Sequence, residues 1–192
     1  MIAGVVLAAG GAARFGSPKQ LADLDGVPLL QHAVDAMLAV PGIDPVVVVL
    51  GAEAASVRVA VEFRSARTVV CADWDAGMAA SLRCGVTAVD DCEWVIVTLG
   101  DQPRVTPQVI AAVMDAATRA PAGTDAVRAM YDGVPGHPVA LGRAMLPEVA
   151  RLSGDVGARE LLGSATVRTF EAAGLCDPAD VDTPEELEAL RT

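Results

Sequence analysis

Short runs of Val, Ile and Leu alternate along the chain with longer segments in which apolar residues return every three or four positions. The short runs predict strands that are buried on both faces, at Ile2–Leu7, Val46–Leu50, Thr68–Cys71 and Trp94–Leu99. The longer segments predict helices, at Pro28–Val40, Ala52–Phe63, Met78–Val89 and Thr106–Ala120. Because strands and helices alternate, right-handed crossovers and a mainly parallel sheet follow.

After residue 120 the pattern changes to shorter elements. Two strands are expected at Ala126–Met130 and Val139–Leu141, on either side of a rigid Gly/Pro-rich insert at Gly133–Pro138. Three helices are expected after them, at Arg143–Leu152, at Ala158–Leu162 and from Thr183 onward. No internal repeat or linker interrupts the chain. We therefore expect one domain over residues 1–192, a Rossmann-like three-layer α/β/α fold with a mainly parallel sheet and a late antiparallel strand.

The amino-acid composition and charge exclude several classes of function. The 192 residues carry 14 Lys+Arg against 25 Asp+Glu, a formal charge of −11, and only 3% are aromatic. A nucleic-acid surface needs a basic footprint, so we expect no nucleic-acid partner. The most apolar run, Pro45–Gly51, is too short to span a bilayer, and no basic leader precedes the first strand, so we expect a cytoplasmic, membrane-free protein. The four cysteines form no CxxC pair and are expected to be reduced.

The first strand is followed by small residues and two cations, Arg14 and Lys19. At the carboxyl end of a parallel strand, small residues let backbone N–H groups approach phosphate oxygens. The segment matches neither the GxGxxG fingerprint nor a Walker A loop. It predicts a phosphate-binding loop of another kind; the alternative is a glycine-rich turn with two solvated cations.

Two aspartates stand where they can bind a metal ion. Asp101 directly follows the strand Trp94–Leu99, at the same edge of the sheet as the glycine-rich loop, and Asp182 precedes the last helix. Mg²⁺ takes few protein ligands and completes its octahedron with water and substrate phosphates, so one or two carboxylates suffice. The alternative for each is a turn or helix-capping role.

Two further segments are candidates for substrate contact. Gly77–Leu82 brings small residues to the ligand edge and includes Ser81, although the same pattern is typical of a tightly packed helix start. His137 lies in the Gly/Pro-rich insert and can reach a second substrate, or it is an ordinary turn residue. The other histidine, His32, is expected at the surface.

Together these motifs resemble the molybdenum cofactor cytidylyltransferases, a family of nucleotidyltransferases. The matching segments run along the whole chain: Leu7-Ala8-Ala9-Gly10 with Arg14, Gly16 and Lys19; Gly77-Met78 with Ser81-Leu82; Gly100-Asp101-Gln102-Pro103; Gly136-His137-Pro138; Gly154-Asp155-Val156-Gly157-Ala158-Arg159; and Asp182-Thr183-Pro184-Glu185. The first motif is shared by many nucleotidyltransferases, whereas Gly-His-Pro and Gly-Asp-x-Gly-Ala-Arg are more selective. Ala12 and Ala13 depart from the hydroxyl or basic residues common in the family.

The resemblance implies transfer of CMP from CTP to the phosphate of molybdenum-bearing molybdopterin, with release of pyrophosphate. It also implies that residues 1–105 mainly bind the nucleotide and that residues 106–192 mainly form the side of the pterin substrate. The implied catalytic residues are Arg14, Lys19 and Asp101, and the implied metal ligands for Mg²⁺ are Asp101 and Asp182. Nucleotide contacts are implied for Leu7, Ala8, Ala9, Gly10, Gly11, Arg14, Lys19, Gly77, Ser81, Leu82 and Asp101, and contacts with the second substrate for Gln102, Pro103, Gly136, His137, Pro138 and Arg159.

Other functions stay open. A related cytidylyl- or guanylyltransferase would act on methylerythritol phosphate, on a sugar phosphate, or on molybdopterin with GTP. Outside enzymes, a nucleotide sensor would not need Asp101 and Asp182, and a pterin carrier would not need Lys19. We expect a monomer, with a molybdoenzyme or its maturation chaperone as the suggested protein partner.

Overall fold

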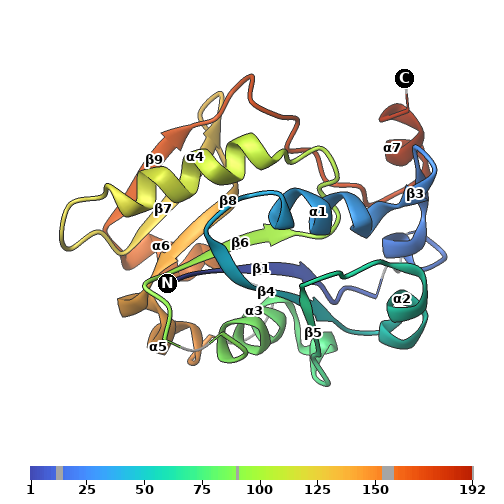
Figure 1. The fold of residues 1–192 in the computed structure, drawn as a ribbon, viewed down its shortest axis with the longest axis horizontal. Helices are drawn as coiled ribbons and strands as arrows, with labels where there is room; N and C mark the ends of the chain where they lie inside the picture. Colours follow the sequence, from blue (N-terminus) through green and yellow to red (C-terminus); the bar gives the residue numbers. More distant parts are fainter. Residues whose placement is uncertain (12–14, 90, 153–157, 192) are drawn as a thin grey trace.

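A seven-stranded sheet forms the middle of the molecule (Figure 1). The computed structural model describes residues 1–11, 15–89, 91–152 and 158–191, with residues 158–160 described by their backbone alone. The strands lie in the order β5-β4-β1-β6-β8-β7-β9. Their bounds are β1 Ile2–Ala8, β4 Ile43–Leu50, β5 Arg67–Val70, β6 Trp94–Leu99, β7 Ala126–Tyr131, β8 Val134–Gly142 and β9 Val167–Glu171. In this sheet β8 is antiparallel to both of its neighbours, and the other pairings are parallel.

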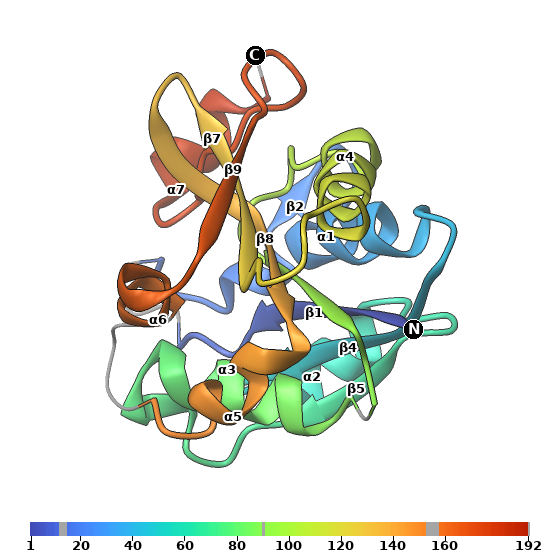
Figure 2. The same ribbon diagram turned by 90° about the vertical axis from the view of Figure 1, so that its left-hand side faces the viewer.

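Helices cover both faces of the sheet, which confirms the three-layer α/β/α prediction (Figure 2). One face packs against α1 and α4, the other against α3 and α5. The helices are α1 Leu29–Leu38, α2 Ala54–Ala60, α3 Met78–Thr87, α4 Pro107–Thr118, α5 Leu146–Val149, α6 Ala158–Ser164 and α7 Pro184–Ala189. Short 3₁₀ turns η1 (Lys19–Leu21), η2 (Trp74–Ala76) and η3 (Arg143–Met145), and a two-stranded ribbon of β2 (Asp23–Leu24) and β3 (Val27–Pro28), complete the described elements.

The central strands are apolar on both faces because each face carries its own core. Val6 packs into the cluster under α1 and α4, while Val5, one residue earlier, packs into the cluster under α3 and α5. Both side chains have no exposed surface. Alternation of side chains across a strand therefore explains why the sequence shows continuous apolar runs here rather than an alternating pattern.

The Gly/Pro-rich segment is not an insert between strands, and that expectation was wrong. The turn is only Asp132-Gly133, both with positive φ, and Val134–Pro138 already belongs to β8. Prolines are tolerated there because the first half of β8 pairs with β7 alone, whereas pairing with β6 begins at Val139. A strand with one free edge does not need every backbone N–H.

Three smaller differences have local causes. Strand β9 was missed because it is a half-exposed edge strand without a run of apolar residues. The expected helix at Arg143–Leu152 is instead η3 followed by the four-residue α5. His32 is half-buried rather than on the surface, since its Nε2 lies 2.9 Å from the carbonyl oxygen of Leu24.

Within the described ranges, no helix combines the length and apolar character that a membrane span requires.

Candidate functional site

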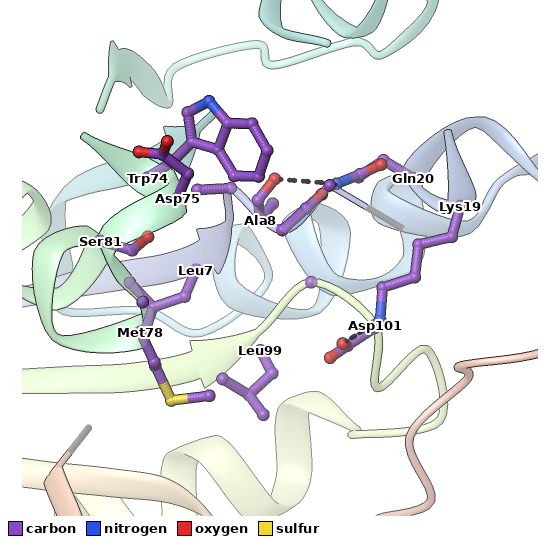
Figure 3. A pocket seen from close by; sticks show the side chains of 15 residues that line it. Leu7, Ala8, Lys19, Gln20, Trp74, Asp75, Met78, Ser81, Leu99 and Asp101 are labelled. Atoms are coloured by element: carbon purple, nitrogen blue, oxygen red, sulfur yellow. Dashed lines mark hydrogen bonds and ion pairs between the residues drawn. The ribbon is translucent and has the colours of Figure 1, made fainter. Parts of the chain in front are cut away.

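A cavity of about 310 Å³ opens where β1 and β6 end, at the edge of the sheet where open α/β folds bind ligands (Figure 3). The loop after β1, η1, η2 and the start of α3 complete its wall. Its lining consists of Leu7, Ala8, Ala9, Gly10, Gly11, Lys19, Gln20, Trp74, Asp75, Gly77, Met78, Ser81, Leu99, Gly100 and Asp101. Most of the nucleotide-contact residues implied by the sequence therefore line one cavity.

Lys19 links two carboxylates at the rim of this cavity. Its Nζ donates to Asp101 Oδ2 at 2.6 Å and to Asp182 Oδ1 at 2.9 Å, and its side chain is only 12% exposed. Burial by itself would lower the pKa of Lys19, but the ion pairs with Asp101 and Asp182 outweigh it and raise that pKa above its ordinary value. The ammonium group is thus held in its charged form.

A backbone contact brings the second aspartate to the first. The N–H of Val181 donates to the carbonyl oxygen of Asp101 at 2.9 Å, so the segment before α7 lies along the loop after β6. The N-cap of α7 is Thr183, which forms a capping box with Glu186. The capping role is therefore filled by Thr183, while the Asp182 carboxylate faces Lys19.

The glycine-rich loop after β1 is contacted from two sides by residues that the sequence analysis did not select. Gln20 Nε2 donates to the carbonyl oxygens of Ala8, at 3.1 Å, and Gly10, at 2.8 Å. On another side, a Cβ added to Gly11 would lie 2.8 Å from the ring of Trp74. The position of Gln20 directly after Lys19 was the available signal; nothing in the local pattern pointed to Trp74.

A second cavity, of about 770 Å³, adjoins the first, since Met78 and Leu99 line both. Gln102, Gly136 and His137, which were expected to contact the second substrate, line it. Its other lining residues are Arg128, Tyr131, Asp132, Val134, Pro135, Val139, Leu162, Pro178 and Asp180. The lining comes from both halves of the chain, so each half contributes to this cavity.

His137 adds no charge of its own to the wall of the second cavity. Burial, with a smaller effect of the Arg128 cation, lowers the pKa of His137 to about 4, so the imidazole is neutral at physiological pH. Tyr131 Oη donates to the His137 carbonyl oxygen at 2.6 Å and fixes the backbone there. Near the junction of the cavities, burial and the Asp101 charge raise the pKa of Asp180.

Some implied site residues lie elsewhere. Leu82 is 1% exposed and belongs to the core under α3, because one further residue along a helix turns the side chain away from the cavity wall that Ser81 lines. Pro103 and Pro138 are buried beside the second cavity's lining residues but do not line it. Arg14 lies outside the described residues, and the side chain of Arg159 does too.

The donor set fits a hard divalent cation that shares its ligands with a substrate. In the described part of the chain no group of three or more His, Cys, Asp or Glu side chains is arranged to hold a metal ion. Asp101 and Asp182, however, already converge on one cation, the Lys19 ammonium, and Asp101 Oδ1 is buried without a hydrogen-bond partner. Two carboxylates completed by phosphate oxygens and water are the usual surroundings of Mg²⁺.

Comparison with known proteins places the chain in a family. Residues 4–169 match the MobA-like NTP transferase domain, and the chain therefore belongs to this family of nucleotidyltransferases. It is 32% identical to nicotine blue oxidoreductase of Paenarthrobacter nicotinovorans, over 98% of this chain and 96% of that protein.

Solved structures agree with this assignment. The crystal structure of Rv0371c from Mycobacterium tuberculosis superposes with a TM-score of 0.88 at 35% identity, covering 98% of this chain and 96% of that one, and Rv0371c is also known as a complex with manganese. A nucleotidyl transferase from Methanothermobacter superposes with a TM-score of 0.82 at 26% identity, covering 100% and 96%. The fold and its family are thus shown by both sequence and structure.

Proposed function

We propose that this nucleotidyltransferase transfers CMP from CTP to the phosphate of a molybdopterin-type acceptor, giving molybdopterin cytosine dinucleotide and pyrophosphate. In this reaction an oxygen of the acceptor phosphate bonds to the α-phosphorus of CTP. The bond from that phosphorus to the oxygen bridging to the β-phosphate breaks, and pyrophosphate leaves. The motifs shared with molybdenum cofactor cytidylyltransferases support both the choice of nucleotide and the choice of acceptor.

The observation that carries the proposal is the charged group between the two cavities. Lys19, Asp101 and Asp182 meet where the first cavity ends, and Gln102, the residue after Asp101, lines the second. A reaction between two bound substrates needs such a junction, because the reacting atoms must be held close together and in line. The two cavities, about 310 and 770 Å³, are of the size that small-molecule ligands fill.

The chemistry requires charge and positioning more than proton transfer. A phosphate monoester has a second pKa near 6, so the attacking oxygen is already largely ionised at neutral pH and needs no general base. A neutral His137 is compatible with this mechanism. The Lys19 ammonium stabilises negative charge that develops on the triphosphate during transfer, as preorganised cations do in phosphoryl transfer.

We also propose that Mg²⁺ takes part, held by Asp101 and Asp182. When bound, it would neutralise charge on the triphosphate oxygens. The similar Rv0371c protein has been crystallised as a complex with manganese, which supports the binding of a divalent cation by this chain. Calorimetric titration of Mn²⁺ into the protein, with and without CTP, tests this separately from turnover. We expect nucleotide-dependent binding that Asp101→Asn weakens; binding unaffected by this variant would contradict the proposed ligands.

Pyrophosphate release tests the reaction directly. The protein is incubated with Mg²⁺, the pterin phosphate acceptor and CTP, GTP or ATP in turn, and pyrophosphate is measured with a coupled phosphate assay. We expect release with CTP that depends on the acceptor. Release with CTP only when methylerythritol phosphate or a sugar phosphate is supplied would assign a different acceptor.

One similar protein is named as an oxidoreductase, and this supplies a contrasting outcome. A redox reaction needs an electron donor and acceptor but no cleavage of a triphosphate. If none of the three nucleotides yields pyrophosphate with any of these acceptors, while a reduced nicotinamide dinucleotide is consumed in the presence of a dye, the proposed transfer is wrong.

A further inference from the structure

Two buried glutamines differ in a way that separates a structural role from a role at the site. Gln20 and Gln31 are each 6% exposed, and each uses its Nε2 group for two hydrogen bonds. Gln31, on α1, also accepts from the N–H of Glu62 at 2.8 Å, so its amide is fully used. Gln20 Oε1 is buried and has no partner.

The orientation of the Gln20 amide follows from its surroundings. Nε2 faces two carbonyl oxygens, that of Ala8 (Figure 3) and that of Gly10. The reversed orientation would therefore place an oxygen against two oxygens. An unpaired buried acceptor costs stability. Gln20 therefore is not arranged to maximise stability, and what it does contribute is a pair of hydrogen bonds to the loop after β1.

Those two hydrogen bonds, together with the pairing of Ala8 with Leu50 of β4, hold the direction in which the N–H groups of Ala9 and Gly11 point. In a trans peptide the C=O and the N–H point in opposite directions. The cis peptides of the described chain lie elsewhere, at Asp44-Pro45 and His137-Pro138. Holding the carbonyl oxygens of Ala8 and Gly10 toward Gln20 therefore turns the N–H groups of Ala9 and Gly11 to the opposite side of the loop. Both of these residues line the first cavity.

We infer that Gln20 is a positioning residue for the nucleotide. It touches no reacting atom; it acts by holding the loop after β1 with the N–H groups of Ala9 and Gly11 turned toward the phosphate oxygens of a nucleoside triphosphate. Successive N–H groups turned to one side form an anion-binding concavity, which suits this acidic chain because it adds positive potential without a charged side chain. The inference rests on the proposed function only in taking the ligand of the first cavity to be a nucleoside triphosphate.

The matched pair of glutamines gives the experiment its control. Gln20→Glu keeps the shape of the side chain but replaces the donor by oxygens that face the two carbonyls, and Gln20→Leu removes the polar group. Gln31→Leu removes an equally buried amide that contacts Asp35 and Glu62 rather than the loop. The affinity for CTP is measured by calorimetry in the presence of Mg²⁺ and in EDTA, together with the Tm of each variant.

We expect both Gln20 variants to raise the Kd for CTP about 10- to 100-fold, with the larger effect for Gln20→Glu, in both conditions. Gln31→Leu lowers the Tm but changes the Kd for CTP less than about twofold. If Gln20→Glu is folded and binds CTP like the native protein, or if Gln31→Leu weakens CTP binding as much as the Gln20 variants do, the positioning role is wrong.

The same measurements keep the two proposals distinguishable. A native protein that binds CTP but releases no pyrophosphate would contradict the proposed reaction and leave the role of Gln20 standing, provided the Gln20 variants lose CTP affinity. Conversely, Gln20 variants with unchanged CTP affinity in a protein that releases pyrophosphate would overturn the positioning role alone.

Discussion

The two adjoining cavities handle polarity in different ways. The first ends in the half-buried ion-pair group of Lys19, Asp101 and Asp182 and borders a loop that Gln20 holds by two hydrogen bonds. The second is larger, is lined by apolar side chains together with the charged residues Arg128, Asp132 and Asp180, and keeps its histidine neutral. In the proposed reaction, the first cavity would hold the triphosphate beside one cation and two carboxylates, and the second, larger cavity would hold the bulkier acceptor.

Among the variants that test this comparison of the cavities, Asp101→Asn is expected to have the largest effect, on pyrophosphate release. It preserves the shape of the side chain but removes one of the two negative charges next to Lys19. We expect pyrophosphate release to fall by more than about 10³-fold, with a small change in Tm because the side chain is at the cavity rim. Asp115→Asn, which alters an exposed ion pair on α4, is the control and keeps full activity. Normal release by folded Asp101→Asn would remove Asp101 from the catalytic residues.

Lys19→Met is expected to separate catalysis from cation binding. Loss of the ammonium lowers transfer by about 10²- to 10³-fold, since a preorganised positive group of this kind contributes about 2.7–4 kcal/mol to transition-state stabilisation. The carboxylates of Asp101 and Asp182 are then no longer paired with Lys19, so the protein without nucleotide binds Mn²⁺ more tightly than the native protein does. Calorimetry with Mn²⁺ alone measures this gain. A weaker affinity for Mn²⁺ in Lys19→Met would contradict the shared site.

Gly11→Ala tests the wall of the first cavity opposite the charged group. The added Cβ would lie 2.8 Å from Cη2 and Cζ3 of Trp74, so the loop or the indole must shift. We expect the Kd for CTP to rise about tenfold. The double variant Gly11→Ala with Trp74→Phe removes the far edge of the indole and recovers part of the affinity. Absence of any recovery would mean that the clash is not what weakens binding.

Substitution of His137 is expected to have the smallest effect on function, and this effect is confined to acceptor binding in the second cavity. Because its pKa is about 4 when folded and about 6.5 when unfolded, the unfolded chain binds more protons between these values. Stability is therefore lost as pH falls from about 6.5 to about 4, and His137→Gln removes that part of the dependence. Denaturant unfolding at several pH values measures this dependence.

The same variant also tests the function of the second cavity. We expect His137→Gln to raise the KM for the acceptor a few-fold and to leave the Kd for CTP unchanged. A changed CTP affinity would reverse the roles given to the two cavities.

Much of this architecture was predictable because it depends on patterns among residues that are close together in the sequence. Runs that are apolar on both faces predict central strands of a parallel sheet, and residues directly after such strands must lie at one edge of it. Lys19, Asp101 and most of the glycine-rich loop could therefore be placed together from the sequence. Thr183 and Glu186 likewise predicted the start of the last helix, since a capping box is a contact between residues three apart.

What only the tertiary structure decided depends on contacts between distant segments. Asp182 reaches Lys19 across 163 positions of the chain because Val181 pairs with the backbone of Asp101, and neither contact leaves a periodic pattern. The prolines of β8 suggested a loop because their tolerance depends on where the neighbouring strand β6 begins to pair. The role of Gln20 depends on two carbonyl oxygens of another element. Periodicity records which face of an element is buried, whereas the partner across that face is determined only when the elements pack.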